Sequence, residues 1–151
     1  QDFILLKSNT FMRFGEMRLI KWHMCEIFTH DKQRLVRINL PAHICKNRKD
    51  RTVVARGGRY LERMRERSRF TDPDDYVFSN VEQRSVLAKT TFYKYWSQLM
   101  NVTQMPELTG KKLTYYSLRH FGITARLMAK VPHYQVAKFA GTDVRHIETH
   151  Y

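Results

Sequence analysis

The end of the chain divides into three short helical segments, and this division constrains the fold more than any other feature of the sequence. Residues with helical periodicity cover positions 116–130, 132–140 and 143–151. Pro132 and Gly141 separate these segments, because proline is tolerated in the first turn of a helix and glycine readily ends one. The pattern predicts three successive helices, with Arg119 near the start of the first and Tyr151 at the end of the last.

A region closer to the N-terminus favours β-structure instead. Three short runs are typical of strands: residues 25–29, 34–40 and 51–55. A polar turn at His30-Asp-Lys-Gln33 joins the first two runs, and the basic segment Lys46-Asn-Arg-Lys-Asp50 lies between the second and third. Further helices are predicted over residues 12–22, 60–67 and 90–100. We therefore expect an α+β fold that is mostly helical, with a small antiparallel β-sheet near the N-terminal third.

The chain carries a large excess of positive charge. It has 27 Lys and Arg residues against 14 Asp and Glu residues, for a formal net charge of +13. A polyanion is the natural partner of such a chain, and nucleic acid is favoured over a membrane because no apolar run is long enough to span a bilayer. Net charge alone leaves open the alternative that the excess is solvated surface.

Length and cysteine content indicate one domain in a reducing compartment. A chain of 151 residues with 42% hydrophobic residues can bury one proper core. Cys25 and Cys45 offer no disulfide framework, so a cytoplasmic protein is expected. Because the chain begins on Gln1 and stops on a functional-looking tyrosine, we interpret residues 1–151 as a fragment of a longer protein.

A few basic side chains and one tyrosine suit chemistry at a phosphodiester. Attack on phosphorus adds negative charge to the equatorial oxygens, and two arginines can hold that charge through paired hydrogen bonds. Arg13 and Arg119 are the candidates. A lysine on a mobile hairpin tip can protonate the leaving oxygen, with Lys46 the first choice and Lys49 the reserve. Ionising the nucleophile Tyr151 at neutral pH costs about 4 kcal/mol unless neighbouring cations offset it.

Four segments of the chain together resemble the catalytic domain of the tyrosine recombinases, the phage integrase family. The matching segments are Thr10-Phe-Met-Arg13-Phe-Gly-Glu16, Lys46-Asn-Arg-Lys-Asp-Arg-Thr-Val-Val54, Tyr116-Ser-Leu-Arg119-His120, and Gly141-Thr142 followed by Tyr151. They occur in the family's order, and the resemblance extends from about Leu5 to Tyr151. It implies catalytic roles for the following residues: Arg13, Lys46, Tyr116, Arg119, Thr142 and Tyr151. Glu16 would orient the first arginine, and His120 would support the site.

The resemblance implies a site-specific DNA recombinase, or integrase, that integrates or excises a mobile element. Tyr151 would form a 3′-phosphotyrosine and release a 5′ hydroxyl, with no metal and no other cofactor. The expected partners are double-stranded DNA attachment sites, and the expected assembly is a homotetramer on DNA from protomers that are monomeric when free. An accessory DNA-bending or excision factor is a further partner that the family allows. A bacterial, nucleoid-associated protein is implied, with the amino-terminal DNA-clamping domain and the C-terminal tail absent from this chain.

Two positions depart from the family's usual residues, and a set of basic side chains is expected to bind DNA. Tyr116 stands where histidine is commonest, and Thr142 stands where histidine or tryptophan is usual. Both can donate a hydrogen bond to a phosphate oxygen, but neither carries positive charge there. The basic residues expected to contact the DNA backbone are Arg48, Lys49, Arg51, Lys111 and Lys112.

Other interpretations of the same residues remain open. The protein could be a catalytically silent DNA-binding relative with the same fold, or a cutter of single duplexes such as a type IB topoisomerase or hairpin-forming resolvase. His146 and His150 lie four residues apart, a spacing that can hold zinc in a hydrolase, but Glu148 between them points to another face of the helix. The aromatic residues 92, 93, 95 and 96 fit a helical core better than a platform for stacking bases.

Overall fold

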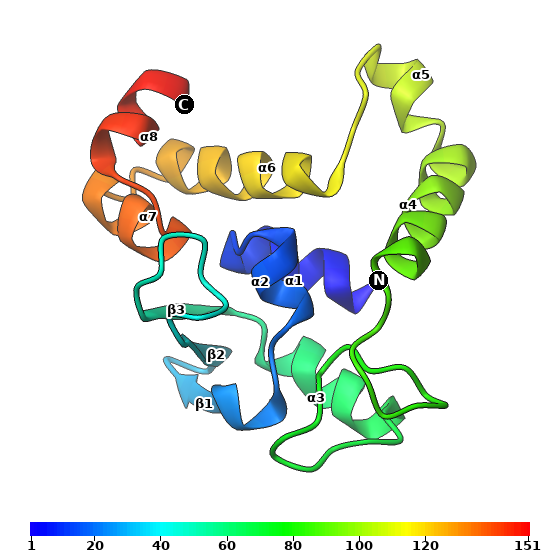
Figure 1. Cartoon of the computed structure of the whole chain (residues 1–151). Helices are drawn as coiled ribbons and strands as arrows, with labels where there is room; N and C mark the ends of the chain where they lie inside the picture. The colour runs from blue at the N-terminus through cyan, green and yellow to red at the C-terminus, as the bar shows by residue number, and fades with distance from the viewer.

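The computed structural model describes residues 1–151 and contains eight α-helices and one three-stranded sheet (Figure 1). The helices are α1 (Asp2–Thr10), α2 (Phe14–Arg18), α3 (Gly58–Arg67), α4 (Lys89–Thr103), α5 (Met105–Thr109), α6 (Tyr115–Met128), α7 (His133–Ala140) and α8 (Val144–His150). The strands are β1 (Cys25–His30), β2 (Gln33–Leu40) and β3 (Arg51–Arg56). The expectation of a mostly helical α+β fold with a small sheet is confirmed.

The sheet is an antiparallel meander in the order β1-β2-β3. Asp31 and Lys32 both have positive φ, 47° and 63°, which suits a tight two-residue turn between β1 and β2. Alternate residues of β2 and β3 face the core, where Val36 lies opposite Ala55 and both are buried. The longer connection between β2 and β3, residues 41–50, extends to the other end of the sheet, beside α7 (Figure 1).

Helix α6 runs across the molecule above α1 and α2, with α7 and α8 at one end and α4 and α5 at the other (Figure 1). The main core lies between the sheet, α1, α3 and α4. A smaller core lies between α6, α7 and α8 and is built on Ile123, Val136 and Ile147. Phe11, at the end of α1, is buried in this smaller core, and Tyr151 packs against it. The two cores therefore place the start of α2 next to the end of the chain.

The aromatic stripe of α4 is only partly a core feature. Phe92 and Trp96 are buried, and Phe92 joins an aromatic cluster with Phe3 and Tyr115. Tyr93 and Tyr95 are half exposed or more. No helix of the structure has the length and apolar character needed to cross a membrane.

The predicted helix over residues 12–22 is wrong in extent, because α2 covers only five residues there. Phe11 takes a left-handed conformation that ends α1, and Arg13 has an extended backbone that begins α2. After Leu19 the chain leaves the helix, and Lys21 forms an isolated antiparallel bridge with Tyr76. Backbone hydrogen bonds to a distant segment therefore replace the helical continuation that the apolar spacing indicates. The short helix α5 is also absent from the sequence-based expectation.

Candidate active site

Arg13 and Glu16 form the centre of the site at the start of α2. The Glu16 carboxylate accepts hydrogen bonds from the backbone N–H of Arg13 at 2.9 Å and from Arg13 Nη1 at 3.0 Å. Arg51, on β3, donates from Nη2 to Glu16 Oε2 at 2.7 Å. Burial alone would raise the pKa of Glu16, but the charges of Arg51 and Arg13 outweigh it and hold the pKa below its usual value. The ionised Glu16 therefore orients two arginines at once.

Arg119 lies on the first turns of α6 and is almost completely buried, with 3% of its surface exposed. Its Nη1 donates a hydrogen bond to the carbonyl oxygen of Phe11, the residue that ends α1. Burial, followed by the positive charge of Arg13, lowers the pKa of Arg119, while Tyr116 and Tyr151 act in the opposite direction. Two arginines that are far apart in the sequence thus lie close enough to repel each other, an arrangement that favours a shared anion.

Gly141, at the end of α7, contacts the arginine cluster, which consists of Arg13, Arg51 and Arg119. Its carbonyl oxygen accepts a hydrogen bond from Arg13 Nη2 at 3.0 Å. Gly141 has a φ of +63°, and a Cβ at this position would lie only 1.6 Å from Arg51 Nη1. Both the backbone conformation and the packing of Arg51 therefore require glycine here. Thr142 follows directly, half-buried, with its backbone N–H bonded to the carbonyl oxygen of Ala137 at 3.1 Å.

Tyr151 ends the chain just after α8, beside the aromatic rings of α6. Its ring lies 5.0 Å from the ring of His120, and His120 lies 4.7 Å from the ring of Tyr116. The hydroxyl of Tyr151 is buried and makes no hydrogen bond. Burial raises the pKa of Tyr151, Tyr116 adds to this effect, and Arg119 opposes it. The charge of Arg119 therefore does not offset the burial that raises the pKa of Tyr151.

Lys46 lies on the exposed β2–β3 connection and shares a cavity with Arg13. The cavity has a volume of about 440 Å³, and Glu16, Arg48 and Lys89 also line it. Lys49, the reserve candidate, is exposed on the same connection but does not line this cavity. The structure thus brings the first-choice lysine, and not the reserve, next to the arginine cluster.

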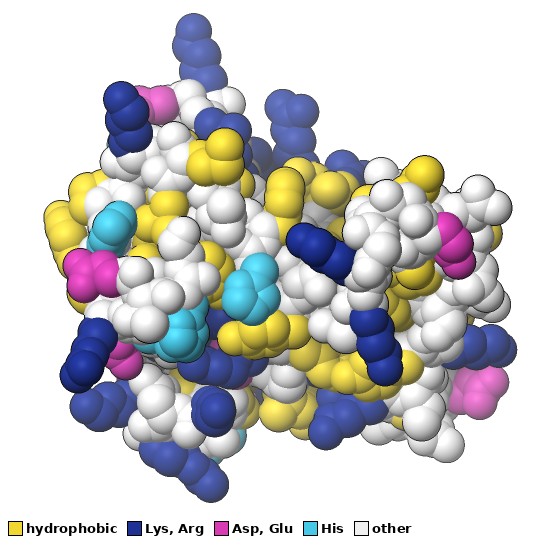
Figure 2. Space-filling view, turned by 90° about the horizontal axis from the view of Figure 1, so that it is seen from above, with side chains coloured by type: hydrophobic (Ala, Val, Ile, Leu, Met, Phe, Trp, Pro, Cys, Tyr) yellow, Lys and Arg dark blue, Asp and Glu magenta, His cyan; other side chains and the backbone are white.

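The basic residues expected to bind DNA do not share one environment. Arg48 and Lys49 are exposed on the β2–β3 connection, and Lys111 and Lys112 are exposed just before α6. Arg51 is different: its side chain is only 8% exposed and is ion-paired with Glu16. The guanidinium of Arg51 holds Glu16 in place, and the contact of Arg51 with the DNA backbone stays a prediction. The face seen from above in Figure 2 carries far more lysine and arginine than acidic side chains, together with a group of histidines.

Sequence reasoning missed one charged residue of this region, Lys7 on α1. Its side chain is completely buried, and its Nζ donates a hydrogen bond to the carbonyl oxygen of Met12 at 2.6 Å. A signal for it exists in the sequence, because Lys7 stands four residues after Phe3 on the apolar side of a short helix.

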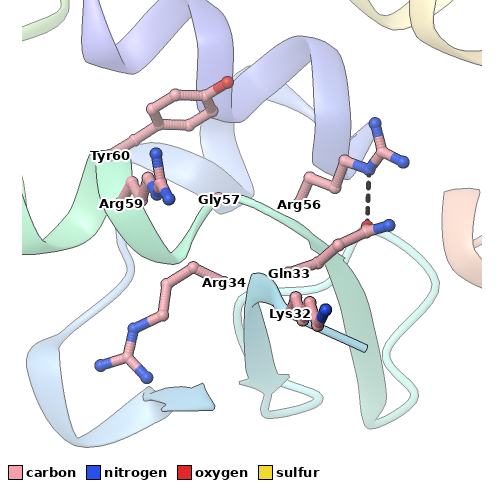
Figure 3. A pocket seen from close by; sticks show the side chains of 7 residues that line it. All are labelled: Lys32, Gln33, Arg34, Arg56, Gly57, Arg59 and Tyr60. Atoms are coloured by element: carbon pink, nitrogen blue, oxygen red, sulfur yellow. Dashed lines mark hydrogen bonds between the residues drawn. The ribbon is translucent and has the colours of Figure 1, made fainter. Parts of the chain in front are cut away.

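The histidine pair of α8 lies beside the end of the chain, with the rings of His146 and Tyr151 6.5 Å apart. The rings of His146 and His150 lie 4.3 Å apart, but no group of three or more His, Cys, Asp or Glu side chains is placed to hold a metal ion. A second basic hollow, of about 390 Å³, lies at the end of the sheet opposite the β2–β3 connection (Figure 3). Lys32, Arg56 and Arg59 line it, and it shares no residue with the cavity around Arg13.

Comparisons of the sequence with models of known families and with curated proteins find no match. Solved structures with a similar fold do exist. One is a crystal structure of the XerH site-specific recombinase bound to difH substrate, a pre-cleavage complex, with a TM-score of 0.71 and 20% sequence identity over 99% of this chain and 42% of that chain. Another is a post-cleavage complex of XerH with palindromic difH substrate, with a TM-score of 0.71 and 18% identity over 98% and 40% of the two chains.

At this level of identity the likeness shows the fold alone. Residues 1–151 have the fold of part of a site-specific recombinase and span less than half the length of that relative. The tyrosine-recombinase fold that the four sequence segments indicate is therefore confirmed.

Proposed function

We propose that this chain is the catalytic domain of a tyrosine recombinase that cleaves and rejoins DNA. One observation carries the proposal: side chains from α2, β3, α6 and the end of α8, distant in sequence, converge on one positively charged site. Arg13 and Arg51 share a single carboxylate, that of Glu16, and Arg119 lies near both arginines without a carboxylate of its own. Such a site has an excess of cations, and a phosphate group supplies the charge that balances it.

The proposed reaction assigns a role to each of four side chains. The Tyr151 hydroxyl oxygen attacks phosphorus, a P–O(Tyr) bond forms, and the bond from phosphorus to the 5′ oxygen breaks. Arg13 and Arg119 donate hydrogen bonds to the non-bridging oxygens, where negative charge increases. Lys46 gives a proton to the departing 5′ oxygen. Attack by a 5′ hydroxyl on the phosphotyrosine reverses these steps and rejoins the DNA.

The Tyr151 proton needs an acceptor, and His120 is the acceptor that we propose. The rings of the two residues lie 5.0 Å apart. Burial of part of the ring, and then the charge of Arg119, lowers the pKa of His120, so its imidazole is neutral and able to accept a proton at pH 7. Tyr116, beside His120, and Thr142, after Gly141, are proposed to donate hydrogen bonds to the phosphate in place of the family's commoner residues.

The partner in this proposal is double-stranded DNA, and the XerH structures of similar fold are bound to difH substrate. The net charge of +13 supports a polyanionic partner. Assembly of four protomers on two duplexes, the integration or excision of a mobile element, and an accessory DNA-bending or excision factor extend the same proposal. The bacterial nucleoid is the corresponding place of action.

The test is the formation of a covalent protein–DNA adduct on nicked suicide DNA from the ends of the element, in the absence of metal. We expect an adduct on a denaturing gel with the natural protein and none with Tyr151→Phe. Tyr134→Phe is the matched control, because Tyr134 is an exposed tyrosine on α7 and should leave adduct formation unchanged. Equal adduct with Tyr151→Phe would exclude Tyr151 as the nucleophile.

A second candidate function is DNA binding without cleavage, and one observation favours it. The Tyr151 hydroxyl is buried, has no hydrogen-bond partner and has a raised pKa, as expected for a packing residue. Binding of the attachment-site DNA with confirmed synapsis, but with no adduct, would select this candidate. Relaxation of a supercoiled plasmid without synapsis would instead select a topoisomerase-like cutter.

A further inference from the structure

Lys7 is a buried cation that the proposed reaction does not use. Its side chain has no exposed surface, and no carboxylate lies within ion-pair distance of its Nζ. Lysine is almost never fully buried unless it is paired, because removing an ammonium group from water is costly. The single hydrogen bond from Nζ to the Met12 carbonyl oxygen, at 2.6 Å, is therefore the contact that holds this side chain in place.

The chain bends at Phe11 and Met12, between α1 and α2. Lys7 and Arg119 each donate a hydrogen bond to one of the two consecutive carbonyl groups of this bend. The Phe11 carbonyl oxygen accepts from Arg119, and the Met12 carbonyl oxygen accepts from Lys7. Phe11 has a φ of 55°, a left-handed conformation that residues with a Cβ adopt at a cost, and the chain then enters α2 at Arg13. Resting on the function proposed above, we propose that Lys7 is a positioning residue, which fixes the bend at Phe11 and Met12 so that Arg13 meets the phosphate.

The charges around Lys7 make its hydrogen bond sensitive to pH. Burial lowers the pKa of Lys7 most, Arg119 on α6 lowers it further, and Glu16 on α2 raises it, leaving a value of about 7. Helix α3 and strand β3 also pack against α1, but none of their charged groups shifts the pKa of Lys7. An ammonium donates a stronger hydrogen bond to a carbonyl than a neutral amine does, so the bend is held best below the pKa.

A bound phosphate should strengthen this arrangement. Its negative charge favours the protonated form of Lys7, so the pKa of Lys7 rises when the site is occupied. Above about pH 7, the hydrogen bond from Lys7 that fixes the bend before Arg13 is therefore weaker in the free protein than in the protein with DNA bound. The ratio of the cleavage rate to the DNA dissociation constant reports on the free protein. This ratio should therefore fall as pH rises above the pKa of Lys7.

The test compares Lys7→Met, which removes the donor, with Lys7→Gln, which keeps a neutral donor, in the full chain. We expect Lys7→Met to slow cleavage about 10- to 100-fold, because a small displacement of a positioning group has effects of this size, while DNA affinity changes little. Lys7→Gln should recover much of the rate. Both variants should lose the fall in rate above about pH 7 that the natural protein shows. Lys94→Met, at an exposed lysine on α4, is the matched control and should match the natural protein.

Folding is checked separately by thermal unfolding. A lowered pKa means that the unfolded chain binds more protons between about pH 7 and 10.5, so Lys7 makes the natural protein more stable as pH rises through that range. Lys7→Met should abolish this rise and be no less stable than the natural protein at pH 6. If Lys7→Met does not fold, Lys7→Gln and its pH profile decide the outcome.

A separate measurement keeps this inference distinct from the proposed function. The Nε–H signal of Arg13 in ¹⁵N NMR spectra reports its position without any cleavage. If the natural protein forms no adduct, the proposed function fails, while a shifted or broadened Arg13 signal in Lys7→Met still supports the positioning role. A folded Lys7→Met with an unchanged Arg13 signal, or with an unchanged cleavage rate and pH profile, would overturn it.

Discussion

At the scale of single residues, the candidate site is an unbalanced set of charges held in place by one carboxylate. Glu16 is 2% exposed and receives hydrogen bonds from both Arg13 and Arg51. Arg119 lies nearby with only a carbonyl group as its partner. Because the cations are oriented before any ligand binds, little reorganisation is needed when a phosphate arrives.

Replacing Glu16 should therefore affect both stability and activity. Glu16→Gln leaves two arginines without their carboxylate, and we expect a loss of about 3 kcal/mol in the free energy of unfolding at pH 7. The folded-state pKa of Glu16 is lowered, so its stabilisation is present above the unfolded pKa and is lost as pH falls through the folded pKa. Urea unfolding at pH 7 and at acidic pH measures this.

The control for Glu16→Gln is Glu107→Gln, at an exposed glutamate on α5 that makes no ion pair. The difference in stability between Glu16→Gln and the natural protein should shrink towards acidic pH, and Glu107→Gln should show no such trend. A constant difference at all pH values would mean that the Glu16 charge does not stabilise the fold.

At the scale of secondary-structure elements, the contact between α1 and α6 sets the position of Arg119. Gly122 lies one turn after Arg119, and a Cβ there would lie 2.2 Å from the carbonyl oxygen of Ser8 and 2.6 Å from the ring of Phe11. The two helices therefore touch through backbone at this point. Phe11 also carries the carbonyl group that Arg119 holds, so the helix contact and the site share one residue.

Gly122→Ala should separate α1 from α6 and weaken the site. We expect a loss of about 1 to 3 kcal/mol in the free energy of unfolding, the usual cost of overpacking, and a larger loss of DNA cleavage than of DNA binding. Gly15→Ala is the matched control, because a Cβ at Gly15 meets no atom within 4 Å. Equal stability of Gly122→Ala and Gly15→Ala would show that α1 and α6 can move apart freely.

The elements also show what the sequence can and cannot predict. The three strands follow from their alternation and turn residues, and the helices α6 to α8 follow from their periodicity and from Pro132 and Gly141. The extent of α2 could not be predicted, because the bridge between Lys21 and Tyr76 joins segments far apart in the sequence. Local spacing also does not reveal burial, so it does not show the ion pair of Arg51 with Glu16 and gives no role to Lys7.

At the scale of the whole molecule, positive charge extends well beyond the site. Exposed Lys111 and Lys112 precede α6, exposed Arg48 and Lys49 lie on the β2–β3 connection, and the hollow of Figure 3 adds a further basic region. When such residues bind DNA phosphates they release counterions, which makes affinity depend on salt. The salt dependence of binding can therefore identify which of these regions meets DNA.

Neutralising Lys111 and Lys112 together should reduce that salt dependence. With both changed to Gln, we expect the slope of log K against log salt concentration to fall by about 2, since each phosphate that a lysine neutralises contributes about 0.9 to the slope. Fluorescence anisotropy with duplex DNA measures the slope. The same change at Lys32 and Arg59, in the hollow of Figure 3, is the matched comparison and should have a smaller effect. An unchanged slope for Lys111 and Lys112 would remove them from the DNA interface.

The central claim, that Tyr151 exchanges a DNA phosphodiester for a phosphotyrosine, is tested most directly by mapping the covalent link. The adduct formed on suicide DNA without metal is digested with nuclease and protease, and the peptides are identified by mass spectrometry. We predict a peptide containing Tyr151 that carries a nucleotide through its 3′ phosphate. A nucleotide on any other residue, a link through a 5′ phosphate, or binding and synapsis with no linked peptide at all would contradict the claim.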